Sequence, residues 1–424
     1  MKFPEPANSN YAATIVKIPA IVPLKGRDRI VGIPLFGGQA IVSKGWEVGD
    51  LGVYFPPEVQ FSHEYASANN LYRDATQNAD STETGYLEPS RRLKALKLGP
   101  HRSDAMFMPL SSLDFTGVNI GQLKEGDTFD QIDGHEICKK YEIKPVREPG
   151  DARQNKITKK FDRVDAKFLP IHIDSDNYWR NLHTIDVLDQ IIVTQKLHGT
   201  SVRIGNTIVR EKPRLRDKIA AKLGIRVQEY SYDNVYGSRK VIKDANNPNQ
   251  QHHYGTDVWT LNGKKLDGLI PRGYVVYGEL VGFTPEGAAL QKNYTYEAGP
   301  AVADLYVYRV AFVSPDGMVT DLSWSQVKKF CTDRGLKHVP EMFTGWHGDF
   351  DVDDWMDTRY RDLGYSQAVA LSDPKLPDEG VCIRVEDGYL PRIYKAKSPA
   401  FLRHESAVLD EGVADIESVG ASAE

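Results

Sequence analysis

Apolar, strand-forming runs recur along the sequence in an irregular order with helical patterns, and this order constrains the fold more than any other feature. In the second part of the chain the runs lie at residues 187–194, 201–209, 274–282, 305–313, 381–386 and 390–396. Helical patterns occur from Trp324 to Arg334 and from Trp355 to Tyr365. A doubly wound sheet needs strands and helices in regular alternation. The irregular order therefore predicts an α+β fold built on antiparallel sheets.

A further β-rich region precedes these strands. Short runs occur at 11–18, 27–36, 39–45 and 51–57, separated by glycine-containing turns, and strand patterns resume at 91–99 and 105–111. Polar residues 58–85 carry few strand signals and are predicted to form a long loop or insertion. Short strands at this spacing predict a small five-stranded barrel of the oligonucleotide-binding (OB) type.

The chain length and local composition predict the domain boundaries. A chain of 424 residues is too long for one ordinary core. We expect an OB-like, nucleic-acid-binding domain over residues 1–143 and the α+β domain over residues 164–405. Residues 144–163 are polar, basic and broken by Pro and Gly, which is typical of a linker. The acidic residues 406–424 predict a weakly structured tail.

The charge and the cysteines exclude several classes of protein. A net charge of −5 argues against a surface coated in positive charge, although a local groove can still bind nucleic acid. Cys138, Cys331 and Cys382 are far apart and predict neither a zinc site nor a disulfide framework. The N-terminal residues lack an apolar signal core, and no apolar stretch is long enough to span a bilayer. We therefore expect a cytoplasmic protein without membrane contact or an obligatory protein partner.

A lysine follows one of the predicted buried strands. The apolar run that ends at Val193 leads directly to Lys196 in the segment TQKLHGTS, residues 194–201. By itself this pattern describes either a solvated lysine at a turn or an amine held in a pocket for chemistry. Two carboxylates favour the second interpretation: Glu279 interrupts the apolar strand 274–282, and Glu379 precedes another. A carboxylate in a buried strand is costly unless it is paired or binds a ligand.

Further strands supply an aromatic face and a pair of lysines. Alternation along a strand puts Tyr306 and Tyr308 on one face, and Lys395 and Lys397 on another. These groups suit covalent nucleotidyl transfer. The lysine amine must be neutral to attack phosphorus, but its ordinary pKa of about 10.4 keeps it protonated at neutral pH. Nearby positive charge lowers that pKa. A divalent ion held by carboxylates and lysines facing the phosphates would stabilise the developing charge.

Six segments resemble ordered motifs of the covalent nucleotidyltransferase superfamily, which contains polynucleotide ligases and mRNA capping enzymes. They are KLHG at 196–199, GSR at 237–239, YGELVG at 277–282, LYVYR at 305–309, EGVCIR at 379–384 and YKAK at 394–397. The segment LQKNYTYEAG at 290–299, and His198 in place of the more usual Asp, resemble nick-sealing RNA ligases. The N-terminal region, with DRIVGIPLF at 28–36, resembles the N-terminal OB domain of Deinococcus-type RNA ligases.

The resemblance implies a role for each matching residue. Lys196 would be the nucleophile, with Glu279, Glu379, Lys395 and Lys397 as the other catalytic residues, and Glu379 and Glu279 as ligands of Mg²⁺ or Mn²⁺. The remaining expected site residues would bind ATP, with Tyr308 stacking on adenine and Arg239 contacting the ribose or a phosphate; they are Gln195, His198, Gly199, Arg203, Arg239, Tyr308 and Arg384.

The resemblance implies an ATP-dependent RNA ligase that seals 3′-hydroxyl/5′-phosphate breaks through lysyl-AMP and an adenylylated 5′ end. Its expected substrate is RNA or an RNA-containing duplex with a nick. A DNA ligase and a GTP-using capping enzyme are the alternatives, but both usually carry an OB domain after the last motif, where only a short segment follows Lys397. A catalytically silent nucleic-acid-binding protein is a further alternative from another class.

Overall fold

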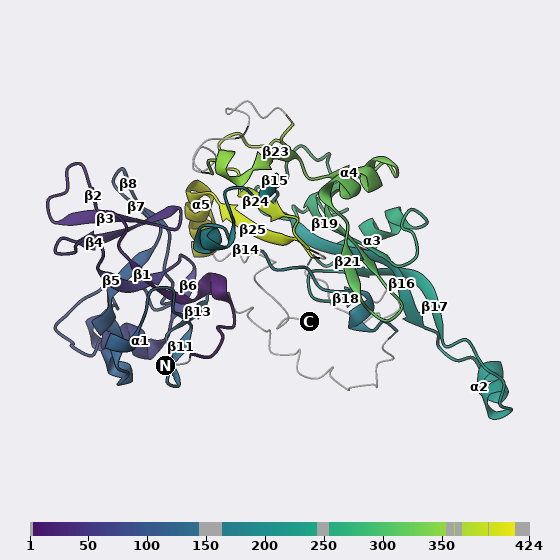
Figure 1. Ribbon diagram of the computed structural model, residues 1–424, viewed down its shortest axis with the longest axis horizontal. Coiled ribbons are helices and arrows are strands. Elements are labelled where there is room, and N and C mark those ends of the chain that lie inside the picture. Colours follow the sequence, from purple (N-terminus) through teal and green to yellow (C-terminus); the bar gives the residue numbers. More distant parts are fainter. Residues whose placement is uncertain are drawn as a thin grey trace.

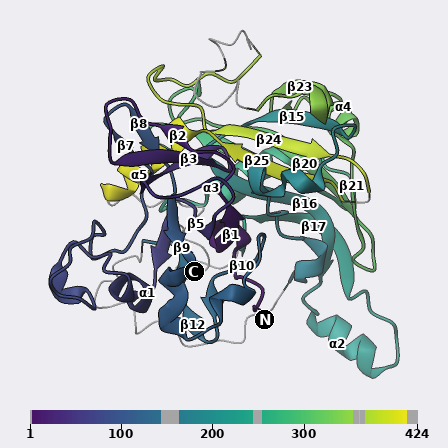
Figure 2. The ribbon, with the colours of Figure 1, turned by 60° about the vertical axis from the view of Figure 1, so that its left-hand side comes forward.

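The computed structural model describes residues 3–143, 163–243, 254–352, 360, 367–388 and 390–411. An N-terminal group of small sheets lies on one side of the molecule, and two larger sheets lie on the other, as Figures 1 and 2 show. The protein has a mixed α+β fold with several antiparallel sheets. This agrees with the fold class expected from the sequence.

The N-terminal part is built from short antiparallel strands and one helix. Its main sheet has the order β10-β1-β5-β9. The elements are β1 (Ala13–Lys17), β2 (Val22–Pro23), β3 (Ile30–Leu35), β4 (Gly38–Ser43), β5 (Leu51–Phe55), β6 (Val59–Phe61), α1 (His63–Ala68), β7 (Leu96–Leu98), β8 (His101–Ser103), β9 (Met106–Pro109), β10 (Thr128–Phe129), β11 (Gln131–Ile132), β12 (His135–Glu136) and β13 (Cys138–Lys140).

The predicted five-stranded barrel is not closed within residues 3–143. Strands β2, β3 and β4 form a sheet of their own, and β7 pairs with β8 as a separate hairpin. A single isolated bridge, Ala40 to Ala105, connects the region of β4 to that of β9. The strand positions were therefore predicted better than the way in which the strands pair, because pairing depends on contacts distant in sequence.

The prediction of a loop over residues 58–85 was wrong. This segment contains β6 and α1, and Phe61, Tyr65 and Tyr72 are buried in the N-terminal core. Ser62 caps α1 by accepting a hydrogen bond from the backbone N–H of Tyr65. The apolar residues of segment 58–85 are widely spaced among polar ones, so the sequence shows neither a strand period nor a helix period there.

The second part of the chain contains two larger sheets. One has the order β14-β25-β24-β15-β23, and the other has the order β18-β17-β16-β19-β20-β21 with β22 beside β20. The strands are β14 (Asp176–Asn177), β15 (Gln190–Lys196), β16 (Thr200–Arg210), β17 (Tyr230–Gly237), β18 (Ile242–Lys243), β19 (Tyr274–Gly282), β20 (Ala303–Val313), β21 (Val319–Asp321), β22 (Lys337–His338), β23 (Glu341–Trp346), β24 (Gly380–Val385) and β25 (Arg392–Lys397). The helices are α2 (Leu215–Lys222), α3 (Val258–Gly263), α4 (Trp324–Thr332) and α5 (Pro399–Asp410).

All six strands expected in this part of the sequence are present, as is the helix expected from Trp324. The helix expected at Trp355–Tyr365 and nearly all of the expected linker lie outside the described residues. The tail was predicted to begin at residue 406, but α5 continues through Asp410. No helix in the described part of the chain is long and apolar enough to cross a membrane.

The two parts of the molecule contact each other at a β-turn and at an N-terminal segment. Gly37, with φ 74°, turns between β3 and β4, and a Cβ there would lie 2.2 Å from Cε2 of Trp179. Arg180 donates to the carbonyl oxygen of Ser9 over 2.6 Å and also contacts the hydroxyl of Thr14. These contacts hold the N-terminal sheets against residues that adjoin β25.

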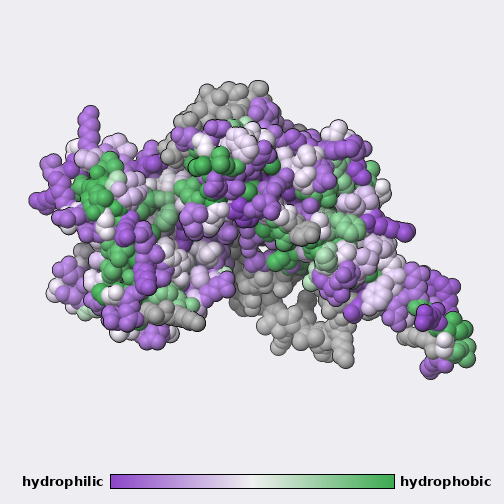
Figure 3. Space-filling view, in the orientation of Figure 1, coloured by the Kyte–Doolittle hydropathy of each residue, from purple (hydrophilic) through white to green (hydrophobic). Residues whose placement is uncertain are grey.

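Helix α2 lies at the end of an arm that β16 and β17 form, away from the other sheets (Figure 1). Leu215 and Leu223 expose 75% and 71% of their surface, and Figure 3 shows hydrophobic atoms at this tip. At the other end of the arm, Gly237, the last residue of β17, pairs with Arg203 in β16.

Candidate active site

The register of β15, β24 and β25 places the predicted reactive residues in two rows across one sheet. Lys196 pairs with Gly380, which pairs with Lys397. In the next row Thr194 pairs with Cys382, which pairs with Lys395. Residues paired across strands, and those two apart along a strand, share a face. Lys196, Lys395 and Lys397 are therefore on one face of the sheet.

The opposite face of the same strands is apolar. Ile191 and Val193 of β15, Val381 and Ile383 of β24 and Ala396 of β25 are buried in one hydrophobic cluster. Burial of this face fixes the register, because a slip by one residue would exchange the two faces. The lysines are therefore directed away from this core by the alternation of the sequence itself.

Glu379 lies at the centre of the reactive face. Its Oε1 is 2.9 Å from Nζ of Lys196 and 3.9 Å from Nζ of Lys397, and its Oε2 is 3.7 Å from Nδ1 of His198. The side chain of Glu379 is only 2% exposed. Its Oε2 has no hydrogen-bond partner among the residues that the structure describes. A buried carboxylate oxygen without a hydrogen-bond partner is suited to a cationic ligand.

Gly380 lets the strands approach at this point. Its φ is +141°, and a Cβ added there would lie 2.0 Å from the carbonyl oxygen of Ala396. A residue with a side chain would have to displace the backbone of β25, which carries both lysines. Gly380 is therefore required for the geometry that brings Glu379, Lys196 and Lys397 together.

Glu279 holds the turn that follows Lys196. Its Oε1 accepts a hydrogen bond from the backbone N–H of Gly199 over 3.0 Å, and its Oε2 accepts one from Oγ of Ser201 over 3.3 Å. The amide of Gln291 donates to the carbonyl oxygen of Gly199 over 2.9 Å. A Cβ at Gly199 would lie 2.2 Å from the carbonyl oxygen of Leu280. The carboxylate of Glu279 in β19 therefore binds the turn that follows Lys196 directly.

His198 sits in an aromatic pocket at the same turn. Its ring makes edge-on contacts with Tyr294 and Phe401, at centroid distances of 4.8 Å and 5.1 Å. Its backbone N–H donates to the hydroxyl of Tyr296 over 2.7 Å. The segment 290–299 and the helix after β25 therefore fix the orientation of the KLHG turn.

The reactive face opens into a cavity of about 1010 Å³ between the two parts of the molecule. Residues of the second part that line it include Lys196, His198, Arg239, Lys240, Glu379, Lys395 and Lys397, together with Asp174 and Asp176. N-terminal residues that line it include Asn10, Tyr11, Thr14 and Lys140. Arg239 pairs with Asp174 at its edge. The concentration of cations at one wall suits a phosphorylated ligand.

The pKa values of Lys395 and Lys397 are shifted in opposite directions. Burial, followed by the charges of Lys397, Lys196 and Arg239, lowers the pKa of Lys395 to about 8. The pKa of Lys397 is raised well above its usual value; burial opposes this rise, and the carboxylates of Glu405 and Glu379 outweigh burial. Lys397 is thus a fixed cation at neutral pH, while the charge of Lys395 can change near that pH.

Five of the predicted ATP-binding residues do not line the cavity, and Gly199 of the KLHG turn is one of them. Gln195 is on the face opposite Lys196 and pairs its amide with the backbone of Val369 over 2.9 Å and 2.8 Å. Arg203 is buried and donates to the carbonyl oxygens of Leu169 and Ser238. Both residues hold neighbouring backbone in place, as expected for buried polar groups.

Tyr308 and Arg384 also have partners within the protein. The hydroxyl of Tyr308 shares a hydrogen bond with Nδ1 of His172. A register shift between Tyr277 and Gly278 on the partner strand interrupts the strict alternation that put Tyr306 and Tyr308 on one face. Arg384 donates to Glu386 over 2.7 Å and to the carbonyl oxygen of Leu322 over 2.7 Å.

The carboxylates meet the requirements of a magnesium ion only in part. Among the described residues, no group of three or more His, Cys, Asp or Glu could hold a metal ion. Magnesium is usually bound through one or two carboxylates together with substrate phosphates and water. Glu379 fits this mode through its Oε2. Both oxygens of Glu279 already accept hydrogen bonds, one from Gly199 and one from Ser201, so Glu279 fits this mode less well.

Sequence reasoning did not find several residues of this site. Tyr296 contacts the KLHG turn, and Glu405 contacts Lys397. Tyr11 lines the cavity from the N-terminal part. The alternating tyrosines in LQKNYTYEAG were a visible signal for Tyr296. For Glu405 and Tyr11 no local pattern distinguishes them from other surface residues.

Comparisons with known proteins identify the class of this enzyme. Residues 189–397 match the RNA ligase family model, and these residues contain Lys196, Glu379, Lys395 and Lys397. No curated protein matches the chain. The reactive segment that the sequence and the sheet register bring together is thus an RNA ligase segment.

Solved structures of a Naegleria gruberi RNA ligase share the fold over nearly the whole chain. The structure with PPi has a TM-score of 0.60 at 17% identity and covers 95% of this chain and 100% of that chain. A point mutant with ATP and Mn has a TM-score of 0.57 at 16% identity, with coverages of 94% and 99%. Another, with AMP and Mn, has a TM-score of 0.57 at 17% identity, with coverages of 92% and 98%. Residues 189–397 of the present chain therefore match the RNA ligase family, and the chain shares its fold with a solved RNA ligase.

Proposed function

We propose that this chain is an ATP-dependent RNA ligase that joins a 3′-hydroxyl to a 5′-phosphate through lysyl-AMP and an adenylylated 5′ end. The observation that carries the proposal is the position of Nζ of Lys196. It lies 2.9 Å from Glu379, on the same strand face as Lys395 and Lys397, at the wall of a cavity large enough for a nucleotide.

In the first step the neutral amine of Lys196 attacks the α-phosphorus of ATP. A phosphorus–nitrogen bond forms, the bond from the α-phosphorus to the bridging oxygen breaks, and pyrophosphate leaves with that electron pair. The attacking nitrogen gives up one proton to solvent, and Glu379 Oε1, 2.9 Å away, orients the amine. Glu279 fixes the turn after Lys196, so the amine is held in position before ATP binds.

Cations on the same wall would bind the phosphates. Lys395 and Lys397 line the cavity beside Lys196, and Arg239 lines it from the end of β17. Positive groups fixed in place stabilise charge that develops on the leaving pyrophosphate. A Mg²⁺ or Mn²⁺ ion bound at Oε2 of Glu379 would neutralise further phosphate charge.

The solved relatives support ATP as the substrate. The Naegleria gruberi RNA ligase was solved with ATP and Mn, with AMP and Mn, and with PPi. ATP is the substrate and PPi a product of the proposed first step, and AMP is the product released in the last step. The shared fold and the site in this chain make the same ligands the best candidates here.

The two later steps need a polynucleotide beside Lys196. AMP moves from Lys196 to a 5′-phosphate, and a 3′-hydroxyl then attacks that 5′-phosphate, forms the phosphodiester bond and releases AMP. The cavity extends from Lys196 to Thr14 and Lys140 of the N-terminal part. We propose that residues 1–143 act as an OB-like nucleic-acid-binding domain, as in Deinococcus-type RNA ligases, and that the substrate is a nicked duplex with an RNA 3′-hydroxyl strand.

The competing enzymes make different predictions for one assay. Purified protein would be incubated with ATP and magnesium on four nicked duplexes, with RNA or DNA on each side of the nick. Sealing that requires RNA at the 3′-hydroxyl supports the proposal, and equal sealing of an all-DNA nick would indicate a DNA ligase. Label transfer to the protein from GTP but not from ATP would indicate a capping-type enzyme.

A further inference from the structure

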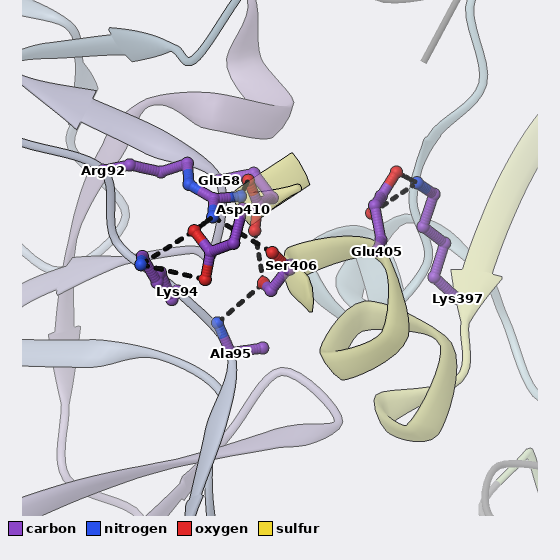
Figure 4. Close-up of polar contacts among 8 residues, drawn as sticks. All are labelled: Glu58, Arg92, Lys94, Ala95, Lys397, Glu405, Ser406 and Asp410. Carbon is purple, nitrogen blue, oxygen red and sulfur yellow. Dashed lines mark hydrogen bonds and ion pairs between the residues drawn. The ribbon is translucent and has the colours of Figure 1, made fainter. Parts of the chain in front are cut away.

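Helix α5 connects the reactive face to the N-terminal sheets. It begins immediately after β25, where Oγ of Ser398 accepts a hydrogen bond from the backbone N–H of Phe401 and Pro399 occupies the first turn. Figure 4 shows Glu405 of this helix beside Lys397, and Ser406 and Asp410 beside N-terminal residues. Helix α5 lies outside the segment 189–397 that matches the RNA ligase family.

Lys397 lies closer to Glu405 than to Glu379. Nζ of Lys397 donates to both oxygens of Glu405, over 2.9 Å and 3.1 Å, and lies 3.9 Å from Glu379. The side chains of Lys397 and Glu405 are 20% and 13% exposed. An ion pair at this depth, with two hydrogen bonds to one ammonium, restricts the lysine far more than a solvated pair would.

The residue after Glu405 is fixed to the N-terminal part. Oγ of Ser406 donates to Glu58 and accepts from the backbone N–H of Ala95 over 3.1 Å. Arg92 donates to the carbonyl oxygen of Ser406 over 3.0 Å and to Glu58 over 2.8 Å. The position of Glu405 is therefore set by contacts between α5 and the N-terminal sheets, as Figure 4 shows.

Three further ion pairs join the same helix to the N-terminal part. Asp410 pairs with Arg92 and, over 2.8 Å, with Lys94. Arg403 lies 3.5 Å from Asp104, which is buried in the N-terminal part. We call Glu58, Arg92, Lys94, Ser406 and Asp410 the α5 clasp.

We propose that Glu405 is a positioning residue that holds the ammonium of Lys397 at the phosphate side of the cavity, and that the α5 clasp holds Glu405 in place. The proposal rests on the proposed function, because it assigns Lys397 to the phosphates of ATP. It makes docking of the N-terminal part a condition for a correctly placed Lys397. Glu405 itself acts through Lys397.

The test measures lysyl-AMP formation in a single turnover as ATP is varied. For E405Q we expect the maximal rate to fall by about tenfold to a hundredfold, as for a displaced catalytic group. The ATP concentration for half-maximal rate should change less, because binding of ATP uses several other contacts. The matched control is E411Q, at the residue that follows the same helix, where Glu411 pairs with exposed Lys292 over 2.6 Å; it should behave as wild type.

A double-variant comparison separates positioning from a merely structural effect. In a K397M background there is no ammonium to position, so E405Q should slow labelling no further, whereas a structural effect would slow it again. If E405Q does not fold, E405D takes its place in the same comparison. A maximal rate for E405Q equal to that of wild type, or a further fall in the K397M background, would overturn the inference. Wild-type protein that forms no lysyl-AMP would instead overturn the proposed function.

Discussion

Nζ of Lys196 lies 2.9 Å from Oε1 of Glu379, and two strands distant in the sequence produce this contact. Lys196 ends β15 and pairs with Gly380, the first residue of β24, so Glu379 immediately precedes the strand at the level of the lysine. The contact gives the amine a fixed direction toward the cavity. It also neutralises part of the positive charge that three lysines would otherwise concentrate on one face.

Gly380 should not tolerate a side chain. We expect G380A to reduce lysyl-AMP formation strongly and to destabilise the fold, because its Cβ would lie 2.0 Å from the carbonyl oxygen of Ala396 and φ is +141°. Strain of this kind costs about 1–3 kcal/mol. Labelling by ATP and urea unfolding would measure the two effects. The control is G388A on the loop before β25, where a Cβ would meet its nearest atom only at 4.0 Å.

Lys395 should give the first step a characteristic pH dependence. Its pKa is lowered to about 8, so the free enzyme has this cation below that pH and loses it as the pH rises. We expect kcat/KM for lysyl-AMP formation to fall above about pH 8 relative to a variant that keeps its charge. In K395R this fall should disappear, since arginine stays protonated. The same high-pH profile in wild type and K395R would remove Lys395 from phosphate binding.

Arg92 should contribute to stability mainly by pairing with buried Glu58. Their side chains are 2% and 7% exposed, and the ion pair is 2.8 Å long. Removal of one partner leaves a buried charge, which costs about 3–5 kcal/mol, so R92M should unfold at much lower urea concentration. The double variant R92M/E58Q should recover part of this loss.

The pH dependence of R92M follows from the carboxyl of Glu58. Burial raises its pKa above the usual value even beside Arg92, and removal of Arg92 should raise it further. A folded protein that binds the proton more tightly than the unfolded chain gains stability as pH falls. The destabilisation by R92M should therefore be smaller at pH 5 than at pH 8. A penalty that grows toward pH 5 would contradict this account.

The sequence predicted the strands and the reactive lysines of the site better than the supporting residues. Lys196, Lys395 and Lys397 were predicted to be together from motif order and period-two alternation, and the strand register brings them to one face. Gln195 follows the same alternation to the opposite face, so it could have been excluded from the cavity by parity alone. At that position the motif resemblance points to the cavity, whereas the strand geometry directs the side chain away from it.

Other parts of the site depend on contacts that no local pattern contains. Arg203 is buried against carbonyl oxygens of Leu169 and Ser238, far from it in sequence. Residues 406–410 were assigned to a tail because they are acidic and near the end, yet Ser406 and Asp410 bind N-terminal residues. Hydrogen bonds and ion pairs between residues distant in the sequence decide both cases, and composition does not predict them.

The central claim is that the amine of Lys196 becomes covalently attached to AMP. It is tested most directly by incubation of wild type and K196A with ATP labelled at the α-phosphate and with magnesium, followed by a denaturing gel. We predict label on the wild-type protein, its release by added pyrophosphate, and no label on K196A. Label that persists on K196A, with wild-type yield, would contradict the account.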